Sequence, residues 1–232
     1  MSGTHRTRRK EINEIDMRSG FRKWLLIIIA FLLAAGCATK QTELNDAKAY
    51  LNRGAAYKNT GQHDQAISDY NKALEINPRY AEAYNNRGNA YDDKGQHNQA
   101  ISDYNKALEI NPRYTEAYYN RGLFYARKGQ YDQAISDNNK ALEINPRYAE
   151  AYYNRGNAYS EKGQYDLAIS DYTKALEINP RFAFAYNNRG NTYFEKGQYD
   201  KAWGDVHKAQ DLGFKVHPGF LKALRKASGR QK

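Results

Sequence analysis

From Ala47 onward, apolar and polar positions recur along the chain at one fixed interval, the distance from Ala47 to Ala81. In the second unit, one apolar stripe at helical spacing runs to Lys94, Gly95 interrupts it, and another runs from Asn98 to Asn111. Each unit therefore predicts two helices, which bury their stripes only by stacking on neighbouring units. The units are 47–80, 81–114, 115–148, 149–182 and 183–216.

A glycine recurs inside every predicted first helix, where it costs about 0.5–1 kcal/mol relative to alanine. Its repetition implies that the partner helix approaches the backbone closely. These glycines are Gly54, Gly88, Gly122, Gly156 and Gly190.

The units resemble the tetratricopeptide repeat (TPR) in the spacing of their aromatic and small residues. In the second unit the matching positions are Tyr84, Gly88, Tyr91, Ala100, Tyr104, Ala107 and Pro112. The resemblance implies an all-α, right-handed superhelix of helical hairpins with a concave groove. Two units depart from the pattern, because Asn138 replaces the tyrosine of its neighbours and Phe214 replaces the proline.

An arginine precedes each packing glycine, and an aspartate follows it at a constant spacing within the same unit. In a helical hairpin these positions meet across the interface, where a guanidinium binds a carboxylate through two hydrogen bonds. We predict structural pairs at Arg53–Asp69, Arg87–Asp103, Arg121–Asp137, Arg155–Asp171 and Arg189–Asp205.

Asparagines recur on the face that lines the concave groove in TPR arrays. A primary amide both donates and accepts hydrogen bonds, so a ladder of amides can bind the backbone of an extended peptide. The alternative is that these residues only cap helices or contact water. The predicted groove residues are Asn52, Asn86, Asn89, Asn120, Asn154, Asn157, Asn188 and Asn191, with Tyr119, Tyr153, Leu123, Phe184 and Phe194 as apolar contacts.

One TPR subfamily clamps the carboxylate terminus of chaperones with lysines beside such asparagines. The corresponding lysine positions are Leu51, Asn85, Tyr119, Tyr153 and Asn187 here. The clamp is absent, and a chaperone tail is therefore not the expected ligand.

The amino-terminal segment carries an apolar run from Trp24 to Ala35, too short for the roughly 20 residues that span a bilayer. Basic residues before it and small residues after it are typical of a secretory signal. Leu33 to Cys37 resembles a bacterial lipobox, apart from Ala34 at a position usually held by leucine. We therefore expect a signal peptide over 1–36, lipidation of Cys37 and a tether over 37–46. A cleaved signal without lipid and an uncleaved inner-membrane anchor are the alternatives.

The segment before Met17 includes three acids, which is unusual for a signal peptide. Translation from Met17 gives a compact signal with Arg18, Arg22 and Lys23 as its charges. Met17 is therefore the expected start.

The net charge of +10 lies in the tails: +4 in residues 1–23 and +6 in residues 208–232, with a neutral stretch between them. Nucleic-acid-binding domains carry a basic stripe on their working face, so no nucleic-acid partner is expected. Residues 217–232 form the predicted capping helix and basic tail, for which contact with anionic lipid or an acidic partner is a second role.

The chain shows no phosphate loop, nucleophile motif or cluster with the spacing of metal ligands. His63 and His97 alternate with tyrosine in other units, which indicates packing. We expect no enzyme activity, metal or cofactor. We expect a scaffold lipid-anchored in the bacterial envelope, at the outer membrane facing the periplasm because Ala38 follows Cys37. It binds a protein or peptide partner in envelope assembly, secretion or pilus biogenesis. A soluble intracellular adaptor and an accessory subunit of an envelope enzyme are the alternatives.

Overall fold

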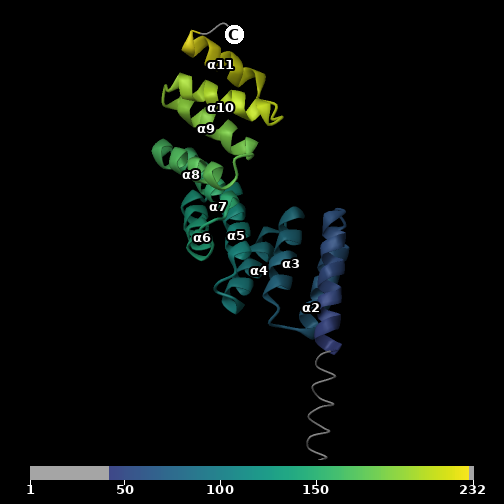
Figure 1. Cartoon of the computed structure of the whole chain (residues 1–232). Helices are drawn as coiled ribbons and strands as arrows, with labels where there is room; N and C mark the ends of the chain where they lie inside the picture. The colour runs from purple at the N-terminus through teal and green to yellow at the C-terminus, as the bar shows by residue number, and fades with distance from the viewer. Residues whose placement is uncertain (1–41, 230–232) are drawn as a thin grey trace, which may run out of the picture.

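The chain folds into a row of helical hairpins, and the computed structural model describes its residues 42–229 (Figure 1). Residues 42–59 form the first helix. The others are α2 (His63–Ile76), α3 (Ala81–Asp93), α4 (His97–Ile110), α5 (Thr115–Arg127), α6 (Tyr131–Ile144), α7 (Ala149–Glu161), α8 (Tyr165–Ile178), α9 (Ala183–Glu195), α10 (Tyr199–Asp211) and α11 (Pro218–Ser228). The described segment contains no strand, which confirms the predicted all-α solenoid.

The first helix and α11 lie at opposite ends of the array (Figure 1). Each odd-numbered helix from α3 to α9 packs against the even-numbered helix that follows it and against the one that precedes it. The signal segment and Cys37 lie outside the described residues.

Local chemistry sets the turns between helices. Gly95 has a φ of 73°, a conformation that glycine adopts without steric penalty. This turn returns the Gln96 N–H to the Tyr91 carbonyl at 2.8 Å, so the end of α3 is capped by backbone. At the next boundary, the Asn111 side chain accepts a hydrogen bond from the Arg113 N–H at 3.1 Å, and Pro112 lies between them.

In three of the units, the glycine inside the first helix is required by a buried tyrosine ring. A Cβ atom added to Gly88 would lie 2.9 Å from Cε1 of Tyr104, which is only 1% exposed. The Tyr104 ring therefore occupies the space that any larger residue at position 88 would need. Gly54 with Tyr70 and Gly156 with Tyr172 repeat this contact.

The last helix, α11, covers the open end of the array. Leu224 is fully buried against α10, with Phe220 and Leu221 partly buried beside it. The Trp203 indole donates a hydrogen bond to the Ser228 hydroxyl at 3.0 Å. The helix buries one stripe and leaves Lys222, Arg225 and Lys226 exposed.

Candidate peptide-binding groove

The first helices of successive units line one continuous inner face. α3 contacts α5, α5 contacts α7, and α7 contacts α9, whereas the second helices make no comparable contacts with one another within residues 42–229. Because the first helices approach each other more closely, the array curves toward them, and their outward faces form its concave surface.

A stripe at helical spacing marks this concave surface on each first helix. On α7 it consists of Glu150, Asn154, Asn157 and Glu161, whose spacing of three or four positions places them on one side of the helix. The same positions on α9 hold Phe184, Asn188, Asn191 and Glu195, and those on α3 hold Glu82, Asn86, Asn89 and Asp93. On α5 the set is Glu116, Asn120, Leu123 and Arg127.

Two of the predicted ladder amides, Asn120 and Asn188, bind side chains of the neighbouring first helix. The Asn120 amide donates to Asn85 Oδ1 at 3.0 Å. Asn188 repeats this link two units later, donating to the Tyr153 hydroxyl at 3.0 Å and to Asn157 Oδ1 at 2.9 Å. Part of the ladder therefore holds the first helices together and fixes the shape of the concave surface.

A second set of amides supports the buried tyrosines. Asn89 Oδ1 accepts the Tyr104 hydroxyl at 2.7 Å, and Asn157 Oδ1 accepts the Tyr172 hydroxyl at 2.8 Å. These bonds satisfy hydroxyls that would otherwise be buried without partners. The sequence pattern did not reveal this structural role, although Asn89 and Asn157 precede their tyrosines at the same spacing.

Other ladder amides keep hydrogen-bonding capacity. Asn154 is the exception, because it is 8% exposed and its Nδ2 is buried near the Tyr119 hydroxyl, where a ligand does not reach it. Asn191 lies with Asn157, Asn188 and Glu161 around a hollow of about 360 Å³ between units four and five. Asn52 is exposed and Asn86 is half-buried. Asn52, Asn86 and Asn191 can therefore bind the backbone of a ligand.

Two tyrosines add aromatic surface at the centre of the groove. Tyr119 packs against Tyr148 and Tyr153 against Phe182, with ring centroids 5.0 and 4.8 Å apart. Burial raises the pKa of both Tyr119 and Tyr153. They are half-buried and neutral at physiological pH, and so present rings and hydroxyls without charge.

The remaining apolar candidates divide between the groove and the cap. Leu123 belongs to the α5 stripe, and Phe184 is 56% exposed with its ring 5.1 Å from that of Phe214. Phe194 differs from the expectation, because its ring packs against Tyr199 and Phe220 beneath α11. Phe194 contacts Phe220 of the capping helix, and the sequence of its own unit does not reveal this contact.

The arginine–aspartate pairs tie the two helices of each hairpin together behind the groove. Arg87 donates to both oxygens of Asp103 at 2.7 and 2.8 Å. Arg121 binds Asp137 through two bonds of 2.7 Å, and Arg155 binds Asp171 in the same way. The Nη1 atom of each also donates to an asparagine of the preceding unit, at 2.5–2.6 Å. One guanidinium therefore links three helices.

Family comparisons agree with this architecture. Profiles described as "Tetratricopeptide repeat" match residues 47–80, 81–114 and 149–182, and also 103–136 and 171–204. A profile described as "TPR repeat" matches residues 124–163. The chain belongs to the tetratricopeptide-repeat family.

Solved TPR structures resemble most of the chain. MamA is 33% identical, with a TM-score of 0.63, over 69% of this chain and 94% of its own. YrrB, described as a TPR protein with an unusual peptide-binding site, is 28% identical, with a TM-score of 0.59, over 77% and 91%. PilW, described as a widely conserved type IV pilus biogenesis factor, is 23% identical, with a TM-score of 0.72, over 80% and 87%. No match was found among curated protein sequences.

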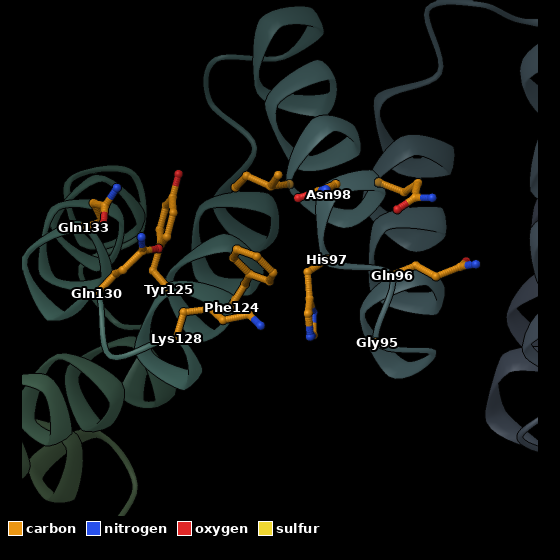
Figure 2. A pocket seen from close by; sticks show the side chains of 11 residues that line it. Gly95, Gln96, His97, Asn98, Phe124, Tyr125, Lys128, Gln130 and Gln133 are labelled. Carbon is orange, nitrogen blue, oxygen red and sulfur yellow. The ribbon is translucent and has the colours of Figure 1, made fainter.

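A separate cleft of about 710 Å³ opens at the edge of the TPR array between units two and three (Figure 2). Phe124 replaces the alanine found at Ala90 and Ala158, and its ring faces His97 at 5.8 Å. The bulky ring occupies the space between α4 and α5. The cleft was not predicted from the sequence, although Phe124 stands where two other units have alanine.

The described residues contain no group of side chains placed to hold a metal ion. Within the same residues, no helix combines the length and apolar character needed to cross a bilayer.

Proposed function

We propose that this TPR protein is a membrane-anchored scaffold that holds an extended segment of a partner protein in its concave groove. The observation that carries the proposal is the inner face of the first helices, where exposed and half-buried amides lie beside aromatic and carboxylate side chains. Such a surface binds a peptide through its backbone and has no use for a catalytic group.

The similarity to YrrB, with its described peptide-binding site, supports the groove as the binding surface. The fold shared with PilW, a type IV pilus biogenesis factor, makes pilus biogenesis one candidate process. The lipobox-like segment ending at Cys37 supports an anchor in the envelope, and Ala38 supports the outer membrane.

Site-specific photocrosslinking tests the groove. We expect Leu123→p-benzoylphenylalanine, in the full-length protein in its own cells, to form an adduct with a partner. Leu167, 49% exposed on α8, is the matched control position and should form none. Equal adducts from both positions, or none from position 123, would contradict binding in the groove.

Fractionation tests the anchor. Cys37→Ala should release the protein from the membrane fraction and abolish incorporation of labelled fatty acid. Unchanged membrane association and labelling would refute lipidation at Cys37.

A further inference from the structure

The junction between units two and three lacks an ion pair that other junctions share. Elsewhere an aspartate in the first turn of a second helix binds the lysine that follows the next first helix. These pairs are Asp64–Lys94, Asp132–Lys162 and Asp166–Lys196. Between units two and three, Asn98 replaces the aspartate, and Lys128 forms no ion pair within residues 42–229.

The stability of α4 does not explain this replacement. An aspartate lies in the first turn of α2, α6, α8 and α10, whereas the first turn of α4 contains no acid. A negative charge at this place interacts favourably with the helix dipole. Asn98 therefore costs α4 both this contact and an ion pair, and it leaves the ammonium group of Lys128 available to another partner.

The same junction carries the bulky ring beside the cleft of Figure 2. Phe124 stands where the other units have small residues, which are Ala56, Ala90, Ala158 and Thr192. The ring packs against that of His97 on α4, with centroids 5.8 Å apart. α5 packs less extensively against α4 than α3, α7 and α9 pack against the second helices before them. The cleft of about 710 Å³ lies at this loosened contact.

The charges around the cleft favour an anionic ligand. No aspartate or glutamate lines it, and Lys128 does. The other titratable cation of its wall, His97, already has an acidic neighbour, because its Nδ1 lies 3.3 Å from Asp92 Oδ1. The exposed Lys128 is therefore the group whose charge a ligand would match.

The uncharged groups of the cleft match a peptide. Its wall contains primary amides whose side chains form no hydrogen bond within residues 42–229, and these are Gln96, Asn98, Gln99, Gln130 and Gln133. A primary amide donates and accepts hydrogen bonds, as a peptide backbone does. The half-buried side chains of Ile101 and Tyr125 add apolar surface. Concave sites with apolar walls and a few polar groups are typical of ligand binding.

We propose that this cleft is a second binding site, which receives an acidic segment of a partner protein. The carboxylate of an aspartate or glutamate side chain binds Nζ of Lys128, in place of the aspartate that other junctions supply. The adjoining backbone forms hydrogen bonds with the amides, and an apolar neighbour of the acid packs against Ile101 and Tyr125. None of the residues that line the cleft belongs to the concave stripes, so this inference does not depend on the proposed groove.

Retention on peptide pools tests the site. The full-length protein is passed over two immobilised pools of pentapeptides, one with aspartate and one with asparagine fixed at the centre, and with the flanking positions varied. We expect the aspartate pool to retain the protein about fivefold more strongly, which is the effect of one exposed ion pair. This preference should decline between about 50 and about 300 mM NaCl, because salt screens exposed charges.

Three substitutions should each remove the preference. Lys128→Gln removes the cation, and Phe124→Ala restores the small residue of the other units. Asn98→Asp is the sharpest test, because it keeps the lysine and supplies the intramolecular partner that α2, α6 and α8 carry. Lys162→Gln breaks the pair with Asp132 at the next junction and is the control, which should keep the preference. Matching circular dichroism spectra would show that all four variants fold.

Equal retention by the two pools, or retention by neither, would overturn the proposal. A preference that survives in both Lys128→Gln and Asn98→Asp would place the acidic ligand elsewhere and overturn the assignment to the cleft. Release by millimolar acetate as complete as release by soluble aspartate peptides would identify a site for small anions and overturn the protein ligand. The photocrosslinking test at position 123 does not use the cleft, so each of these results leaves the proposed function standing.

Discussion

At the scale of the residue, one hydroxyl lacks the partner that its repeat neighbours have. Tyr70 is fully buried and its OH group has no hydrogen-bond partner, whereas the equivalent Tyr104 donates to Asn89. The difference follows from Ala55, which occupies in the first unit the position of Asn89 in the second. An acceptor is missing where the repeat pattern is broken.

Restoring that acceptor should stabilise the first hairpin. We expect Ala55→Asn to be more stable by about 1 kcal/mol than Ala56→Asn, an exposed neighbouring control with the same loss of helix propensity. Urea denaturation followed by circular dichroism measures the difference. Identical unfolding free energies would show that the Tyr70 hydroxyl gains nothing from the new side chain.

At the scale of the element, the arginine guanidinium groups join neighbouring helices through directional hydrogen bonds, in addition to the apolar contacts between them. Arg121 on α5 binds Asp137 on α6 and Asn105 on α4, and it lies between the rings of Tyr118 and Tyr125 at 5.7 and 5.9 Å. This one side chain therefore helps to fix the position of α5 in the hairpin and against the preceding unit.

Removing this guanidinium should destabilise the array. Arg121→Ala leaves Asp137, whose side chain is 5% exposed, as an unpaired buried carboxylate, and we expect a loss of about 3 kcal/mol. Arg113→Ala, at an exposed position before α5, is the control and should change stability little. Thermal and urea unfolding compare them, and similar losses in the two variants would argue against the buried pair.

At the scale of the whole molecule, tyrosine supplies much of the packing between units, and this links stability to pH. Burial raises the pKa of Tyr70 to about 12. It also raises the pKa values of Tyr104, Tyr114, Tyr148 and Tyr172 well above their usual range. The folded state therefore favours the neutral phenols more strongly than the unfolded chain does.

Alkaline pH should unfold the array. An unfolded tyrosine titrates near pH 10, so the stabilisation is fully present below about pH 10 and is lost as pH rises through the higher folded-state pKa values. We expect loss of helical circular dichroism to coincide with the appearance of tyrosinate absorbance for the buried residues. Ionisation of all tyrosines near pH 10 with the helices intact would contradict the effect of burial.

The sequence alone determined the architecture of this protein. The repeat period places apolar stripes, helix-breaking glycines and Asn-Pro boundaries at fixed intervals, and each unit can form its hairpin only by stacking on the next. The arginine–aspartate pairs could also be predicted from their constant spacing, because both partners belong to one hairpin.

Only the tertiary structure decided what the ladder amides do. The bond from Asn120 to Asn85 joins side chains of different units, and the burial of Asn154 becomes visible only when every neighbouring helix is in place. Repeat periodicity specifies the hairpin, but contacts between hairpins determine which polar groups remain available to a ligand.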